Sequence, residues 1–501
     1  MMYISTRDNF EKVTAAQAIK LGMVPAGGLF VPEKIPQMTE EEIMGLKGKT
    51  YQEIAQIILS LYLEDYSVEE IQESVVKAYN SHQFSHVEIA PLQKINEYTF
   101  VMELWHGPTA AFKDMALQVM PHLLSKAIKK LDSQKEIIIL VATSGDTGKA
   151  ALEGFKNVPG IKIIVFYPYQ GVSKVQELQM TTTEGSNTHV VAVKGNFDDC
   201  QSAVKEIFGD VEFKRTLAER GYEFSSANSI NWGRLLPQIV YYFHAYVDLL
   251  EKKEIVAGEK INFVVPTGNF GNILAGWYAA EMGLPINKLI CASNDNKVLA
   301  DFFADGIYNR KRPFIQTISP SMDILISSNL ERFLFEITGH DGEKVKGWMS
   351  DLADEGRFVV EAKSMEKINK IIAAGFATID ETMGTIKKYF DEYGYTFDTH
   401  TAVGMKVYED YVNITGDNTK TVLDATASPF KFNASVQKAI MGQGAVEGKD
   451  EITILKELSD TVKMPIHPSL RDLNKKPILH SRLCEQDGIK NEVKDILDLK
   501  K

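Results

Sequence analysis

Apolar residues recur three and four positions apart in the first part of the chain. The segments that show this spacing are EEIMGLKG, YQEIAQIILSLYL and SVEEIQESVVKAY, between residues 41 and 79. Such spacing puts apolar side chains on one face of an α-helix. The pattern predicts a helix-rich N-terminal domain, to which we assign residues 1–95.

The pattern changes after Pro91. Short runs rich in β-branched residues, namely IIILVA, IKIIVF and HVVAVK, alternate with helical stretches, and the alternation resumes in INFVV and KLICAS. This order is typical of parallel strands joined by crossover helices. It predicts an α/β fold with two open, mostly parallel sheet domains flanked by helices, at residues 96–225 and 226–435.

Three further stretches have helical patterns. NWGRLLPQIVYYFHAYVDLLEKK predicts a largely buried helix with a kink near Pro237. Charged helical patterns surround KVKGWMSDLADEG and KINKIIAAGFA. The tail from about Asp450 predicts exposed helices, so we expect a helical C-terminal extension at residues 436–501.

The composition argues against several classes of function. The 501 residues carry a formal net charge of −12, which argues against a nucleic-acid binder or a protein that binds anionic membranes. The three cysteines are widely spaced, so we expect neither a disulfide framework nor a metal site. The N-terminus lacks the apolar core of a signal peptide, and no apolar run is long enough to span a bilayer. We therefore expect a soluble cytoplasmic protein with a small polar substrate.

One lysine has a setting that favours chemistry. In HGPTAAFKDMALQ, residues 106–118, Lys113 lies among small and apolar residues before an amphipathic helix. An amine that is partly desolvated in this way becomes more nucleophilic, as a Schiff-base lysine requires. The alternative interpretation is a solvated surface charge.

A glycine-containing turn follows the predicted strand INFVV. In PTGNFGN, residues 266–272, Gly268 and Gly271 allow backbone N–H groups to point inward at the start of a helix. This arrangement is typical of a phosphate site. A simple glycine turn at a strand end is the alternative.

A second polar turn, TSGDTGKAA at residues 143–151, follows IIILVA and begins a helix. Ligands of open α/β sheets bind at the carboxyl ends of strands, so hydroxyl and N–H groups here can bind the carboxylate of an amino acid. Capping of the helix by a hydroxyl is the alternative. The segment is not a nucleotide P-loop, because Thr143 stands where that motif needs glycine and Ala150 follows Lys149.

Together these segments resemble the threonine synthase family, whose members are pyridoxal phosphate (PLP) enzymes of the tryptophan-synthase-like fold. The further matching segments are YISTR at 3–7, GGLFVP at 27–32, NSINWGRLLPQ at 228–238, THTAVG at 399–404 and DATASPFKF at 424–432. They follow the family's order and span nearly the whole chain.

The resemblance implies how PLP is held. Lys113 would bind its aldehyde and also act as the base. The other cofactor-binding residues would be Gly268, Asn269, Phe270, Gly271, Asn272, Asp146 and Thr426. Thr426 would meet the pyridine nitrogen with a neutral hydroxyl, which weakens the electron sink. Its segment departs from the family's TAHPAKF at Ser428 and Phe430.

The implied reaction is γ-elimination of phosphate from O-phospho-L-homoserine, followed by addition of water at the β-carbon to give L-threonine. The substrate-binding residues would be Thr143, Ser144, Gly145, Thr147, Asn231 and Arg234. A guanidinium such as that of Arg234 suits bidentate phosphate recognition, although an ordinary surface ion pair is the alternative. Lys149 and Lys431 are lesser candidates. We expect a monomer or a homodimer.

Two other functions compete with this one. Another PLP lyase of the same fold, such as threonine dehydratase or cysteine synthase, would share the lysine and the glycine turn but has no γ-phosphate to hold. A catalytically silent PLP-binding relative would have no need of a base, so the presence of Lys113 argues against it.

Overall fold

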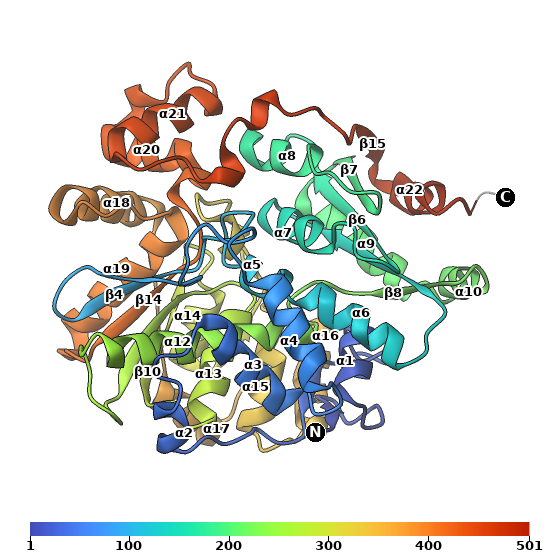
Figure 1. Ribbon diagram of the computed structural model, residues 1–501, viewed down its shortest axis with the longest axis horizontal. Helices are drawn as coiled ribbons and strands as arrows, with labels where there is room; N and C mark the ends of the chain where they lie inside the picture. The colour runs from blue at the N-terminus through green and yellow to red at the C-terminus, as the bar shows by residue number, and fades with distance from the viewer. Residues whose placement is uncertain (500–501) are drawn as a thin grey trace.

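Two separate sheets form the framework of the protein (Figure 1). The computed structural model describes residues 1–499, so residues 500 and 501 of the predicted extension lie outside it. The larger sheet has the strand order β13 (Ile372–Phe376), β10 (Ile286–Ser293), β9 (Ile261–Pro266), β14 (Thr421–Ala425), β4 (Thr99–Glu103) and β3 (Leu92–Lys94). Its neighbouring strands are parallel except for β3 and β4.

The smaller sheet is parallel between all its described neighbours. Its strand order is β15 (Arg482–Glu485), β7 (Thr188–Lys194), β6 (Ile161–Pro168), β5 (Glu136–Ala142) and β8 (Tyr222–Ser225). Two short antiparallel pairs, β1 (Tyr3–Ser5) with β2 (Phe30–Pro32) and β11 (Ile307–Asn309) with β12 (Arg357–Val359), lie outside both sheets. The predicted α/β fold with parallel sheets is confirmed.

The N-terminal helices begin at reciprocal side-chain caps. They are α1 (Ala15–Leu21), α2 (Glu40–Met44), α3 (Tyr51–Tyr62) and α4 (Val68–Ala78). At the start of α3, Thr50 accepts from the N–H of Glu53, whose carboxylate accepts from the N–H of Thr50. Such capping boxes satisfy backbone donors that a helix start leaves free. The three predicted helices of this region are therefore present.

Helices cover both faces of the larger sheet, and its central strands are buried on both sides. In β9, Phe263 and Val265 belong to one apolar core while Val264 belongs to a second core with α19. Successive residues of a strand point to opposite faces, so a doubly covered parallel strand is apolar throughout. The helices of this lobe are α5 (Asp114–Leu117), α6 (Met120–Lys130), α11 (Trp232–Leu235), α12 (Pro237–Glu251), α13 (Gly271–Glu281), α14 (Val298–Asp305), α15 (Leu330–Ile337), α16 (Gly342–Asp354), α17 (Ala362–Ile371), α18 (Ile379–Tyr393), α19 (Thr399–Thr415), α20 (Asn433–Met441) and α21 (Glu451–Val462).

The smaller sheet is packed between its own helices. They are α7 (Asp146–Phe155), α8 (Lys174–Thr181), α9 (Phe197–Gly209), α10 (Val211–Glu219) and α22 (Ile489–Ile496). The C-terminal α22 packs against α9 on the same lobe (Figure 1).

The sheets do not follow the predicted division of the chain. β4 lies within 96–225 but pairs with β14 in the larger sheet, and β15 lies within 436–501 but pairs with β7 in the smaller one. The predicted helical stretch KINKIIAAGFA ends at Ile371, after which IAAGF forms β13 beside β10. These pairings join residues far apart in sequence, and a local pattern does not show them.

The predicted kink near Pro237 is a break between two buried helices. α11 ends at Leu235 and α12 begins at Pro237, which lacks the N–H that a continuous helix would use. Among residues 1–499, no helix combines the length and apolar character that crossing a membrane requires.

The contact between α5 and α7 gives a stability prediction. A Cβ on Gly154 of α7 would lie 1.9 Å from the carbonyl oxygen of Leu117. We expect Gly154→Ala to lower the free energy of unfolding by about 1–3 kcal/mol, because α5 and α7 must move apart. Gly384→Ala is the matched control: this helical glycine has no atom near its Cβ position, so alanine should stabilise by up to about 1 kcal/mol. Equal urea midpoints for Gly154→Ala and the parent would contradict the close packing.

Candidate active site

A cleft of about 1760 Å³ is lined by residues of both lobes. The carboxyl ends of β5, β9 and β14 lie at this cleft, the position where open α/β sheets bind ligands. The predicted site residues that line it are Lys113, Thr143, Ser144, Asp146, Thr147, Arg234, all of 268–272, and Thr426. Gly145 and Asn231 are not among its lining residues.

The lysine segment pairs directly with the segment around Thr426. The N–H of Phe112 donates to the carbonyl of Thr426 at 2.8 Å, and the N–H of Ser428 donates to the carbonyl of Ala110 at 3.0 Å. This short antiparallel bridge places Thr426 beside Lys113 at the start of α5. The Thr426 hydroxyl makes no hydrogen bond to the protein within residues 1–499, which leaves it available in the cleft.

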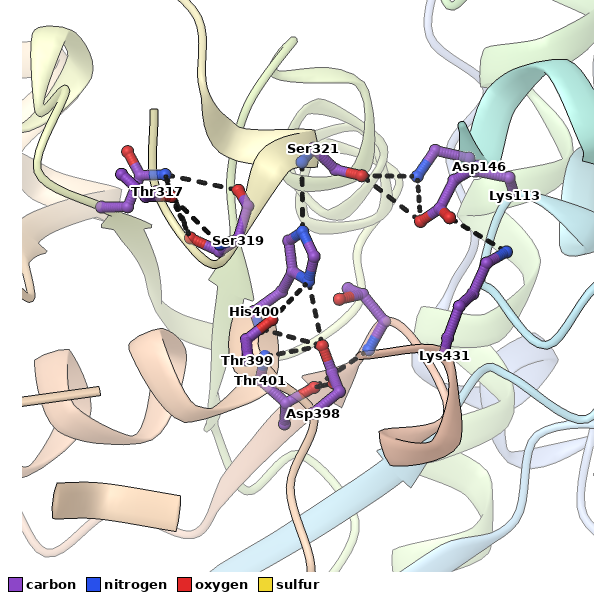
Figure 2. Close-up of polar contacts among 12 residues, drawn as sticks. Lys113, Asp146, Thr317, Ser319, Ser321, Asp398, Thr399, His400, Thr401 and Lys431 are labelled. Carbon is purple, nitrogen blue, oxygen red and sulfur yellow. Dashed lines mark hydrogen bonds and ion pairs between the residues drawn. The ribbon is translucent and has the colours of Figure 1, made fainter. Parts of the chain in front are cut away.

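The amine of Lys113 is buried in a polar pocket (Figure 2). Its Nζ donates to Ser321 Oγ at 3.2 Å and lies 3.5 Å from Asp146 Oδ2. Burial lowers the pKa of this amine to about 8; Asp146 opposes that shift, while Lys431 and Arg234 add to it. This lowered pKa favours the neutral, nucleophilic form of the amine near pH 8.

Asp146 is the carboxylate of this pocket. It accepts from Gln176 Nε2 at 2.9 Å and pairs with Lys431 Nζ at 3.0 Å. Burial alone would raise the pKa of its carboxyl, but the charges of Lys431 and Lys113 hold that pKa well below its usual range. The carboxylate therefore stays ionised.

The turn before α7 is built around Thr143 and Gly145. Thr143 Oγ1 accepts from the N–H groups of Gly145 and Gly148 at 3.0 and 2.9 Å. Gly145 has φ +130°, and a Cβ there would lie 2.4 Å from the Gln176 amide. Gly145 thus makes room for the side chain that binds Asp146. Ser144 and Thr147 are half-buried residues of the cleft wall.

The loop 268–272 forms a cradle of backbone donors at the start of α13. Its N–H groups donate to no protein acceptor within residues 1–499. Phe270 adopts left-handed backbone with φ +62°, and a Cβ on Gly268 would lie 2.5 Å from the carbonyl oxygen of Ser321. Free N–H groups and the helix dipole together favour an anion. Ser321 also contacts Lys113, so cradle and amine lie in one site.

The side chain of Asn272 is held beneath this cradle. Its Oδ1 accepts from Tyr241 and Tyr242, and its Nδ2 donates to Asp424 Oδ2 at 3.0 Å. Burial raises the pKa of the Asp424 carboxyl to about 8, against hydrogen bonds from Asn272 and Tyr242, and Asp424 Oδ1 has no hydrogen-bond partner among the described residues. Asp424 therefore connects the cradle to β14, which leads to Thr426.

Arg234 is a buried cation that faces the cleft. Its Nη1 donates to the carbonyl of Ala227 at 2.8 Å, and no carboxylate within residues 1–499 forms an ion pair with it. Asn231 lies behind it: its Oδ1 accepts from the N–H of Gly233, and its Nδ2 donates to backbone carbonyls. Asn231 thus caps α11, which carries Arg234.

Several side chains at or beside the cleft had no role in the sequence prediction, among them His400, Thr401 and Ser321. His400 Nε2 accepts from the N–H of Ser321 at 3.1 Å, and its Nδ1 lies 3.0 Å from Asp398 Oδ1 (Figure 2). Thr401, which hydrogen-bonds Asp398, also accepts from the N–H of Thr426 at 3.2 Å. His400 lies in the matched segment THTAVG, whereas no motif contains Ser321.

Comparison with known proteins places this site in a family. Three family models match the chain: "Threonine synthase N terminus" at residues 2–79, "Pyridoxal-phosphate dependent enzyme" at 84–375 and "Threonine synthase, C-terminal" at 401–485. A threonine synthase from Pseudomonas aeruginosa is 38% identical over 443 residues, which cover 88% of this chain and 91% of that protein. The chain belongs to the threonine synthase family.

Two further comparisons agree with this. The crystal structure of PLP-bound threonine synthase from Brucella melitensis is 36% identical, with a TM-score of 0.87 over 99% of this chain and 98% of that one. Threonine synthase-like 1 from Homo sapiens is 39% identical over 503 residues, covering 97% of this chain. The chain spans only 65% of the length of that relative.

The cofactor of the family is PLP, and the residues of the cleft fit it. The free N–H groups of 268–272 suit its phosphate, the partly neutral amine of Lys113 suits its aldehyde, and the unpartnered hydroxyl of Thr426 suits a ring nitrogen. Two buried lysines, Lys113 and Lys431, contact Asp146, and a third buried basic residue, Arg234, lines the same cleft. This excess of positive charge matches an anionic ligand.

The protonation of Asp424 gives a pH prediction. Its folded pKa of about 8 lies above the unfolded value of about 3.9, so the folded state binds an extra proton between these values. This group's contribution to stability therefore falls as pH rises from about 4 to 8. Asp424→Asn, which keeps the shape without the ionisation, should unfold at a progressively higher urea concentration than the parent as pH rises. If the urea midpoints of the two proteins instead changed with pH in the same way, Asp424 would be ionised in the folded protein.

Proposed function

We propose that this chain converts O-phospho-L-homoserine and water into L-threonine and phosphate. The observation that carries the proposal is the presence of two anion sites in one cleft. The N–H groups of residues 268–272 provide one, and the guanidinium of Arg234, without a carboxylate partner in the described chain, provides the other. The cofactor phosphate occupies the first, so the second is free for a phosphate carried by the substrate.

PLP supplies an electron sink for carbanion chemistry when it is bound. Within the chain, Lys113 binds the cofactor and moves the proton at the substrate α-carbon, since its amine can be neutral near pH 8. Ser144 and Thr147, at the start of α7, receive the substrate carboxylate together with Thr143. Thr426 offers the pyridine nitrogen a neutral partner.

Arg234 and Asn231 have separate tasks in this proposal. Arg234 binds the substrate phosphate by charge-assisted hydrogen bonds. Asn231 has all its side-chain groups bonded within the protein, so it orients the helix of Arg234 instead of touching the substrate. This differs from the contact predicted for Asn231.

We place the reaction in the cytoplasm, in a monomer or a homodimer. The three cysteines, Cys200, Cys291 and Cys484, are unpaired, as suits a reducing compartment. The curated threonine synthases that resemble the chain over most of their length support the activity.

The rival is a PLP lyase that acts on an unphosphorylated amino acid. Such an enzyme needs the lysine and the cradle but no second anion site. The buried guanidinium of Arg234 favours the phosphorylated substrate, because burying an unpaired cation is costly without an anionic partner.

Purified protein with O-phospho-L-homoserine should release phosphate and threonine in equal amounts. Borohydride reduction followed by peptide mass spectrometry should place the pyridoxyl group within residues 106–118, and Lys113→Ala should lose both the label and the activity. Release of α-ketobutyrate without threonine would indicate the rival lyase. A label on another peptide would contradict the role of Lys113.

Arg234→Ala should retain PLP but bind the phosphorylated substrate weakly. Loss of hydrogen bonds to a charged group costs about 1.5–3 kcal/mol, which corresponds to roughly 10- to 100-fold in the KM for O-phosphohomoserine. Arg310→Ala is the control, because Arg310 also lines the cleft but its guanidinium is exposed and bonds the carbonyl of Ala353. An equal change in KM for both variants would remove Arg234 from its assigned role.

A further inference from the structure

Two buried lysines from distant parts of the chain share one carboxylate. Lys113 stands at the start of α5, Lys431 lies in the turn Pro429–Phe432, and Asp146 begins α7. Lys431 Nζ lies 3.0 Å from Asp146 Oδ1, whereas Lys113 Nζ lies 3.5 Å from Oδ2 (Figure 2). The two ammonium groups therefore compete for a single counter-ion.

Lys431 is the lysine that lies closer to Asp146. Its side chain is fully buried, and its Nζ also donates to the carbonyl of Thr109 at 2.8 Å. Lys113 instead has a neutral hydroxyl partner, Ser321, and the ring of Phe112 at 5.0 Å. A carboxylate neutralises one cation, and the closer and better-bonded lysine is Lys431, so Asp146 compensates the charge of Lys113 less well.

The remaining charges act in the same direction. Arg234 is a further cation that lines the same cleft, and its charge also lowers the pKa of Lys113; His400 accepts from the N–H of Ser321, the hydroxyl partner of Lys113. Asp146 is the only carboxylate that forms an ion pair with either lysine in the described chain. Of the two lysines, Lys113 is thus the one whose proton is more easily lost.

We propose that Lys431 is a positioning residue that occupies Asp146 and thereby leaves the Lys113 amine free to lose its proton. The proposal rests on the proposed function, in which Lys113 is the amine that binds the cofactor. Loss of Lys431 would remove a repelling charge and release Asp146 to pair with Lys113. Both changes stabilise the protonated amine.

The test measures the titration of Lys113 itself. The full-length chain, freed of cofactor, is labelled briefly with acetic anhydride between pH 6 and 10, and mass spectrometry follows the peptide that contains Lys113. Lys431→Met should raise the pH of half-maximal labelling by at least one unit, so that labelling at pH 7 falls about tenfold. Lys431→Arg, which retains the charge, should stay close to the parent.

Lys149→Met is the matched control. Lys149 is also a buried lysine on a carboxylate, 2.9 Å from Glu153, but it does not line the cleft. Its loss removes a buried ion pair, yet it should leave the labelling curve of Lys113 unchanged. If the labelling curve of Lys113 shifted equally in this control, loosened packing would explain the effect and the proposal would be wrong.

An unchanged or lowered titration of Lys113 in a folded Lys431→Met protein would also overturn the proposal. If that variant does not fold, Asp146→Asn gives the same test in reverse: without the carboxylate, the titration of Lys113 should move to lower pH, and no movement refutes the shared counter-ion. A pyridoxyl label on a peptide without Lys113 would instead defeat the proposed function, whatever the labelling curves show.

Discussion

The site depends on a short backbone pairing between segments more than three hundred positions apart. Residues 110 to 112 pair with residues 426 to 428 through the hydrogen bonds of Phe112 and Ser428. Because β4 and β14 are parallel neighbours, the chain leaves both strands at the same edge of the larger sheet. Backbone hydrogen bonds alone thus bring the two loops together. Lys113, Thr426 and Lys431 owe their proximity to this register.

The buried charges of the cleft determine which ligands it can bind. Two buried lysines share Asp146, and the buried guanidinium of Arg234 lines the same cleft without a carboxylate partner in the described chain; burial makes such an arrangement unfavourable without a ligand. The N–H groups of residues 268–272 add partial positive charge from the opposite side. The free protein therefore carries an electrostatic cost that a phosphorylated ligand relieves.

Much of the fold could be predicted from periodicity, and the failures have a common cause. The runs that became β5, β6, β7, β9 and β10 are long and apolar because helices cover both faces of each sheet. β4, β13 and β15 are short, and they form only because a distant strand supplies their hydrogen bonds. No local pattern contains that information.

The site residues likewise divide into those that the sequence predicted and those that it did not. Lys113 and the glycine loop were predicted from their residue types and neighbours, and Asp146 from the family resemblance; the structure brings all three to one cleft, and their roles stay predictions. Ser321 was missed because no motif contains it: it lies in a short 3-10 helix, 208 positions along the chain from the lysine that its hydroxyl contacts. Asn231 was predicted to bind the substrate, whereas its side-chain amide bonds to the backbone and caps α11. A matched motif thus identified a segment at the cleft without distinguishing the side chains that line the cleft from those that bond within the protein.

The order of strands in the two sheets has a consequence for synthesis on the ribosome. β4 remains without its inner neighbour until β14 has been made, and the edge of β7 stays uncovered until β15 arrives. An uncovered parallel edge offers unpaired N–H and C=O groups to other chains. The nascent protein therefore exposes both edges while the chain between these strands is being made, and it should be most prone to pair with other chains during that interval.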